Sequence, residues 1–228
     1  MVKYLVKMSK YGIMLLNLYD FAFEEVIVMS INLSKGQKVN LEKKSSGLGE
    51  ILVNLNWNSR PVKQGFLSGL FGGSQGIDLD LGCLYELKNG RKGVVQALGN
   101  SFGILNQEPY IMLDGDDRTG AAAAGENLRI NGNKLPEFKR ILVYTFIYEG
   151  VANWQQADAV VTIKYPGAED IIVKMDTYNS SNIMCGLVLF ENQNDQTFSV
   201  EKIVQFYQGH QDLDQAFHWG MKWKAGRK

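Results

Sequence analysis

The sequence predicts an all-β fold, an antiparallel β-sandwich with little helix, and three observations lead to this class. From residue 31 onward, short apolar or alternating segments recur at roughly the 8 to 12 residue spacing of sandwich strands. Gly, Pro, Asn and Asp residues separate them, as expected of turns. The apolar fraction of 45% and the aromatic fraction of 11% provide enough material for a core. A β chain of 228 residues commonly folds as one domain.

The individual elements follow from these segments in chain order. We expect strands at 31–33, 38–41, 50–57, 77–87, 93–97, 110–113, 128–130, 140–148, 160–164, 171–176, 184–191 and 197–207. Hairpins are predicted where the polar stretches 165–170 and 192–196 separate two apolar segments. Helix is predicted only near 153–157 and 212–218.

Residues 1–28 differ in pattern from the rest and are predicted to be an N-terminal extension, or an artefact of an upstream start, to a domain over 29–228. Lysines precede an apolar run at 12–19, as in a signal peptide. The run is short, however, no small-residue cleavage site follows, and acids from Asp20 onward interrupt a span of about 20 apolar residues. We therefore expect a cytoplasmic protein.

The charge balance and the rare residue types argue against several classes of function. Lysine plus arginine and aspartate plus glutamate number 24 each, so no overall field favours nucleic acid. The two cysteines, Cys83 and Cys185, lie in apolar stretches and are predicted to be buried thiols rather than a disulfide or zinc site. Neither His210 nor His218 lies in a nucleophile or base motif, so no catalytic residue is expected. Nearby aromatic residues, including Trp219, are expected to anchor the C-terminus on the sandwich.

The first candidate metal site is a pair of aspartates, Asp78 and Asp80. With a side-chain period of two, both project from one face of a strand, while Ile77, Leu79 and Leu81 pack on the other face. Two adjacent carboxylates repel each other, and a bound cation would relieve that repulsion. The alternative is that both simply face solvent on an edge strand.

An acidic turn supplies the remaining candidate ligands. They are Asp114, Asp116, Asp117 and Glu126. Gly115 and Gly120 would let backbone carbonyls turn inward beside these carboxylates, and calcium binds about 6 to 8 such hard oxygens. An EF-hand does not fit, since glycine occupies its first ligand position and the flanks read as strand. Arg118 could instead pair with one carboxylate and leave fewer ligands for a metal.

The segment 65–76 mixes glycine with four large apolar residues. They are Phe66, Leu67, Leu70 and Phe71. Glycine at this density disfavours a regular element, so we expect a surface loop. The alternative is a loop that makes peripheral membrane contact.

The order of these motifs resembles that of the TerD family of tellurium-resistance and stress proteins. The segments that carry the resemblance are 31–37, the strand ending at Trp57, 78–80, 115–120 and 126–128. The resemblance covers about 29–228. Within the family the chain is most similar to the TerA branch, through 78–87, 93–99, 146–150 and 219–226.

The resemblance implies a calcium-binding β-sandwich connected with resistance to tellurite, phage and colicin. Carried over by position, the family's ligand residues fall on Asp78, Asp80, Asp116, Asp117 and Glu126. The chain departs from the family at 121–124, where four alanines replace an acidic glycine-aspartate repeat. This replacement argues against a second calcium site and for weaker binding at the first. The resemblance supplies no catalytic residue.

The leading hypothesis is a calcium-binding, non-catalytic stress-response protein whose partners are other proteins of a tellurium-resistance system. A second hypothesis is a metal-dependent hydrolase that uses the same carboxylates, which would need an open coordination position and a nearby base. A third is a C2-like module that uses calcium to bind anionic lipid, with 65–76 as the inserted loop.

Overall fold

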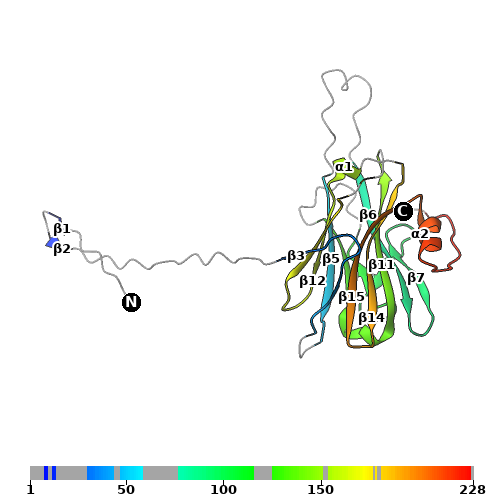
Figure 1. Ribbon diagram of the computed structural model, residues 1–228, viewed down its shortest axis with the longest axis horizontal. Helices are drawn as coiled ribbons and strands as arrows, with labels where there is room; N and C mark the ends of the chain where they lie inside the picture. Colours follow the sequence, from blue (N-terminus) through cyan, green and yellow to red (C-terminus); the bar gives the residue numbers. More distant parts are fainter. Residues whose placement is uncertain are drawn as a thin grey trace, which may run out of the picture.

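The described residues of this computed structural model form two β-sheets packed face to face, as the sequence predicts (Figure 1). The structure describes residues 8–9, 12–13, 30–43, 47–58, 77–115, 125–150, 154–176, 178 and 181–226. Most of 1–28 and all of 65–76 lie outside this set.

One sheet has seven strands. In spatial order they are β3 (Ser30–Asn32), β13 (Asp170–Lys174), β12 (Val160–Lys164), β5 (Glu50–Asn56), β10 (Glu126–Asn131), β9 (Ile111–Leu113) and β8 (Gly103–Ile104). The other sheet has six. Its order is β4 (Lys38–Asn40), β15 (Thr197–Tyr207), β14 (Met184–Gln193), β11 (Phe138–Glu149), β6 (Asp78–Leu87) and β7 (Lys92–Gln96). Among the described strands, only β3 and β13 pair in parallel.

The remaining elements are short. They are β1 (Met8–Ser9) paired with β2 (Gly12–Ile13), the 3-10 helix η2 (Gly132–Glu137), α1 (Trp154–Ala157) and α2 (His210–Ala216). Both expected helices are present, with α2 beginning two residues earlier than predicted. The sequence pattern missed β8 and η2, because a two-residue strand and a short, kinked 3-10 helix give no clear periodicity. No described helix has the length and apolar character needed to cross a membrane.

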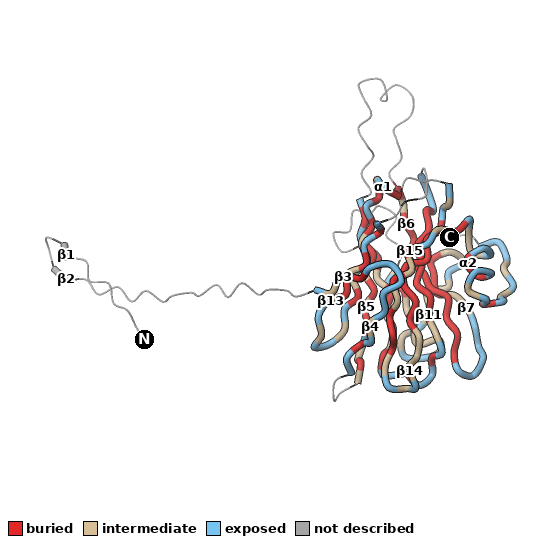
Figure 2. The backbone as a smooth tube through the Cα atoms, in the orientation of Figure 1, coloured by how far each residue is buried: buried red, intermediate tan, exposed pale blue. Residues whose placement is uncertain are grey.

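The main core lies between the two sheets, and buried segments run along the middle of most strands (Figure 2). In β5, Ile51, Val53 and Leu55 are fully buried and alternate with more exposed residues. Cys83 and Cys185 are buried free thiols in this core, as predicted, and burial raises the pKa of both. These thiols therefore stay protonated and inert.

The six-stranded sheet is covered on its outer face as well, which explains why β6 and β11 read as continuous apolar runs. A second hydrophobic cluster there includes Leu84, Tyr144 and Phe146 from the sheet, and Leu213 and Trp219 from the C-terminal part. Trp219 is fully buried, so the predicted C-terminal anchor is confirmed. Figure 1 shows α2 lying beside the sheet near β7.

The C-terminal latch, which we define as α2 with residues 217–223, is held by two buried acids. Arg140 donates to Glu86 over 2.6 Å and stacks its guanidinium 3.8 Å from the centre of the Trp219 ring. Burial acts to raise the pKa of Glu86, but hydrogen bonds from Lys139 and Arg140 outweigh it and hold this pKa below its usual value. Arg140 also donates to the carbonyl of Phe217 at 2.9 Å, so this ion cluster of the sheet is joined to the latch.

The second latch acid, Asp214, ties the chain after α2 into a fixed path. Its carboxylate accepts hydrogen bonds from the backbone N–H groups of Gly220 and Met221, at 2.8 and 3.0 Å. The indole Nε1 of Trp223 donates to the same carboxylate at 3.1 Å. Three donors from one short segment satisfy the acid without a cation.

Candidate functional site

Three predicted ligand residues lie where β6 and β10 begin, and we call Asp78, Asp80 and Glu126 the carboxylate rim. Ile77, Leu79 and Leu81 face the core between the sheets, so the predicted alternation is confirmed. Asp80 is fully buried and lies opposite Phe146 of β11, while Asp78 is only half-buried. β7 pairs only with residues 82–86 of this strand, but Asp80 is 0% exposed and is therefore not a solvated edge residue.

Glu126 reaches the rim from the other sheet. It is the first residue of β10, is 2% exposed, and its Oε2 accepts a hydrogen bond from the N–H of Leu81 over 2.6 Å. Gly125 makes this approach possible, because a Cβ there would lie 2.1 Å from the carbonyl oxygen of Leu55 and its φ is +64°. Glu126 thus contacts the backbone of β6 one residue beyond Asp80.

Asp114, another predicted ligand, is not brought to the same place. Both of its carboxylate oxygens bind Arg129, at 2.6 and 2.5 Å, and Arg129 also bonds Glu50 at 2.5 Å. The hydrogen bonds that Arg129 donates to Asp114 and Glu50 raise its pKa. Arg129 alternates along β10 with the inward-facing Leu128 and Ile130, so this ion cluster lies on the outer face of the seven-stranded sheet.

The other two predicted ligands, Asp116 and Asp117, lie outside the described residues, as do Arg118 and the alanine run 121–124. Within the part of the chain that the structure describes, no three His, Cys, Asp or Glu side chains are grouped so that they could hold a metal ion. A calcium site that used the rim acids would therefore be incomplete within the described residues. A full coordination sphere would need others from the turn at 116–124.

Beside the rim, sequence reasoning missed a buried polar chain on the outer face of the six-stranded sheet. Burial raises the pKa of Tyr144 well above its usual value, and the nearby charge of Asp80 adds to this effect. The Tyr144 hydroxyl donates to Gln96 Oε1 at 2.6 Å, and His210 Nε2 lies 2.8 Å from the same oxygen. No local motif marks Gln96 or Tyr144, because their meeting depends on strand register and on the latch.

Comparison with known sequences shows which proteins this chain is similar to. The TerD domain family matches residues 29–165. Tellurium resistance protein TerA of Alcaligenes sp is 40% identical over 204 residues, which are 90% of this chain and 60% of that protein. Stress response protein SCP2 of Bacillus subtilis (strain 168) is 31% identical over 130 residues, 56% of this chain and 65% of that protein. The chain thus spans less than two thirds of either relative.

A solved structure of a TerD homologue has a similar fold. The crystal structure of a homologue of telluride resistance protein (TerD) from Streptomyces coelicolor A3(2) aligns with a TM-score of 0.50 at 16% identity. The alignment covers 74% of this chain and 95% of that protein. At this identity the match supports a shared β-sandwich.

Proposed function

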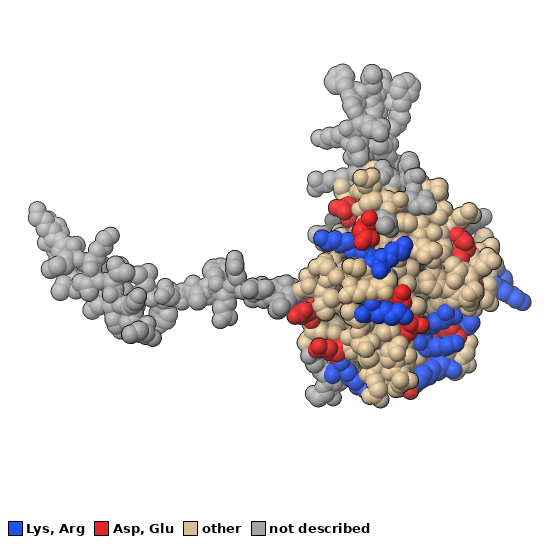
Figure 3. Space-filling view, in the orientation of Figure 1, with Lys and Arg blue, Asp and Glu red and all other residues tan. Residues whose placement is uncertain are grey.

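This chain belongs to the TerD family and is TerA-like, and on that basis we propose that it is a non-catalytic stress-response protein that binds calcium at the carboxylate rim. Its relatives are named as tellurium resistance and stress response proteins. The proposed partners are other proteins of such a system in the cytoplasm. We propose no nucleic acid partner, because basic and acidic residues number 24 each and, on the face drawn in Figure 3, their side chains are interspersed.

The observation that supports the calcium proposal is that Asp80 and Glu126 are both buried, and that Glu126 contacts the residue next to Asp80 in β6, Leu81. Asp80 is fully buried and Glu126 is 2% exposed. Removing a carboxylate from water costs several kcal/mol unless donors or a cation offset it. The turn that connects β9 to β10 adds Asp116 and Asp117 to the same end of β10 in sequence. Carboxylates in this number are the hard oxygen ligands that calcium prefers.

The chain's own residues define what a cation would do there. The hydrogen bond from Leu81 to Glu126 links β6 in one sheet to β10 in the other. A calcium ion, when bound, would supply positive charge among the acids. Glu126 would then remain on the β6 backbone with less electrostatic repulsion, and the contact between the two sheets would be stabilised.

The hydrolase alternative has less support from the described residues. It needs a base poised to take a proton, and burial lowers the pKa of His210 to about 4 while Gln96 binds its Nε2. His218 is exposed at the end of α2. The C2-like alternative depends on 65–76, which lie outside the described residues, so calcium-dependent sedimentation with phosphatidylserine vesicles is its direct test.

Calcium titration followed by thermal and urea unfolding tests the main proposal. At about 100 times its dissociation constant, a ligand adds about 2.7 kcal/mol to the free energy of unfolding. We expect a rise in melting temperature that EDTA reverses, and a smaller rise with magnesium, which demands tight octahedral geometry. Asp80→Asn should abolish most of this rise, whereas Asp170→Asn, which changes a surface ion pair with Lys164, should leave it intact.

A wild-type protein that shows no calcium shift at millimolar metal would contradict calcium binding and leave the family assignment standing. A shift that survives Asp80→Asn would instead move the site away from the rim.

A further inference from the structure

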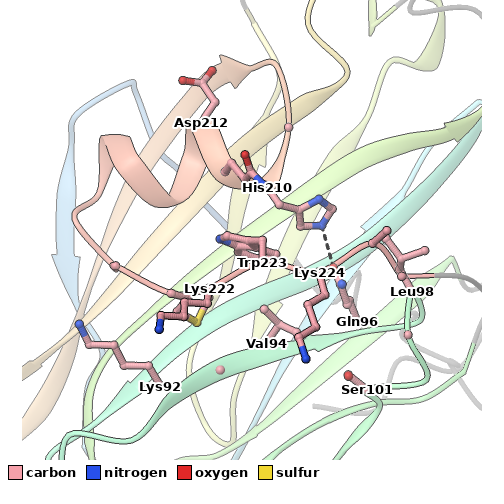
Figure 4. A pocket seen from close by; sticks show the side chains of 18 of the residues that line it. Lys92, Val94, Gln96, Leu98, Ser101, His210, Asp212, Lys222, Trp223 and Lys224 are labelled. Atoms are coloured by element: carbon pink, nitrogen blue, oxygen red, sulfur yellow. Dashed lines mark hydrogen bonds between the residues drawn. The ribbon is translucent and has the colours of Figure 1, made fainter.

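A cavity of about 1350 Å³ opens on the outer face of the six-stranded sheet, and none of the rim acids lines it (Figure 4). Three segments far apart in sequence form it. They are β7 with the turn that follows, α2 with the residues just before it, and the C-terminal residues 220–226. Ligand sites in proteins are commonly concave spaces of about 300 to 1,000 Å³. The cavity therefore has room for a small organic molecule together with water.

The floor of the cavity is aromatic and uncharged, and its rings are tilted relative to one another. His210 packs its ring 5.0 Å from Trp223 and 5.1 Å from Phe146, measured between ring centres. Tyr144 and His210 both bind the side-chain oxygen of Gln96, which fixes the His210 ring (Figure 4). Burial lowers the pKa of His210 to about 4, so the ring is neutral at pH 7. A planar apolar group can stack on such a surface.

The charged side chains around this floor are mostly basic. Lys92, Lys222 and Lys224 line the cavity together with one acid, Asp212. Lys92 donates to the carbonyl of Trp219 at 2.7 Å, and Asp212 accepts from the backbone N–H of Gln208 at 2.9 Å. Lys222 and Lys224 are exposed, and neither forms an ion pair within the described part of the chain. An anionic group in the cavity would have two lysines to bind.

The walls are fixed without a ligand. Asp214 holds Gly220, Met221 and Trp223 in place. At Gly99, Gly209 and Gly220, an added Cβ would meet nothing within 4 Å, so these glycines leave the lining open. A preformed site loses less conformational entropy on binding than one that must order itself.

We propose that this cavity binds a small organic anion that carries a planar ring. The ring lies against Trp223 and His210, and the anionic group lies near Lys222 and Lys224. The site is separate from the calcium function proposed above, since its residues and its ligand chemistry differ.

The test uses two fluorescent probes that share one ring system. The anionic probe is 8-anilinonaphthalene-1-sulfonate, and the neutral probe is N-phenyl-1-naphthylamine, which lacks the sulfonate. We expect the full-length protein to bind the anionic probe more tightly, and the difference to shrink as sodium chloride is raised. Lys222→Gln combined with Lys224→Gln should lower the affinity for the anionic probe about three- to tenfold and leave the affinity for the neutral probe unchanged.

Lys174→Gln is the matched control, because Lys174 is an exposed lysine at the end of β13 in the other sheet. It should change binding of neither probe. Trp223→Leu should weaken both probes, with the melting temperature recorded to detect loss of the latch. The lysine variants alter exposed side chains, so they remain decisive if Trp223→Leu unfolds the latch. Equal affinity for both probes, or an unchanged anionic affinity in the double lysine variant, would overturn the proposal.

Discussion

The C-terminal latch and the carboxylate rim both bury acids against the six-stranded sheet, but they compensate the charge differently. Beneath the latch, Glu86 of β6 binds Lys139 and Arg140, and Asp214 of α2 accepts three hydrogen bonds from the segment that it holds. In the rim, Glu126 takes a backbone N–H from the opposite sheet, and the neighbouring sequence adds further aspartates. The latch acids are thus matched by cations and donors of the chain itself, whereas the sequence beside the rim adds further acids.

This difference indicates which acids serve the fold and which are suited to a ligand. A buried acid with its own donors stabilises one geometry and gains little from added metal. A cluster of acids lowers stability until a cation binds, so its contribution should depend on calcium. The predictions below separate these two behaviours, beginning with the largest effect.

Arg140→Ala should cause the largest loss of stability. It removes one of the two hydrogen-bonding cations of the buried Glu86, and also the cation over Trp219. Breaking a buried ion pair from one side typically costs about 3 to 5 kcal/mol in the free energy of unfolding. Urea unfolding should show this loss equally with calcium and with EDTA. The control is Arg129→Ala, whose more exposed ion pairs should cost about 1 kcal/mol or less. If the loss of stability in Arg140→Ala depended on calcium, the proposed difference between the latch and the rim would be wrong.

His210 should make the latch sensitive to acid. Burial lowers its pKa to about 4, whereas in the unfolded chain it takes up a proton near pH 6.5. Between these values the unfolded state binds more protons, so stability is present above pH 6.5 and is lost as the pH falls toward 4. The shift corresponds to at most about 3 kcal/mol. His210→Phe should remove this part of the pH dependence in urea melts, and His218→Gln should not.

If the slope between pH 6.5 and 4 is the same in wild type and in His210→Phe, the ring is not buried in solution as described. The latch would then be looser than its hydrogen bonds indicate.

At the rim, Glu126→Gln and Asp114→Asn should differ in their effect on calcium stabilisation, and so show which of these two predicted ligands binds the metal. Glu126 faces the start of β6, whereas Arg129 binds both oxygens of Asp114 on the outer face. Glu126→Gln should therefore remove most of the calcium stabilisation of about 2.7 kcal/mol at 100 times the dissociation constant. Asp114→Asn should keep more than half of it in the same calorimetric titration. An equal loss in both variants would show that Asp114 leaves Arg129 to bind the metal.

Removal of residues 1–28 should have the smallest effect, because their sequence pattern differs from that of the domain and the TerD match begins at residue 29. We expect the free energy of unfolding to change by less than about 0.5 kcal/mol, as for surface changes. A loss of several kcal/mol in urea melts, comparable with a core truncation, would make the segment an integral part of the domain.

The sequence by itself determined the fold class, most strands and the inward face of β6. Period-two patterns placed Leu79 and Leu81 in the core and the two aspartates on the other face, because side-chain alternation is a local property of a strand. The isolated cysteines were likewise predictable as buried thiols from their apolar neighbours. The family was also recognisable from the order of short motifs.

Only the tertiary structure decided which acids meet. Asp114 and Glu126 are near each other in sequence, yet one faces Arg129 outside the sandwich and the other reaches Leu81 of the opposite sheet. The cavity at His210 was equally hidden, since its floor joins β7, β11 and the latch. Such contacts depend on the pairing and packing of strands that are distant in sequence. They therefore produce no periodic pattern in the local sequence from which they could be predicted.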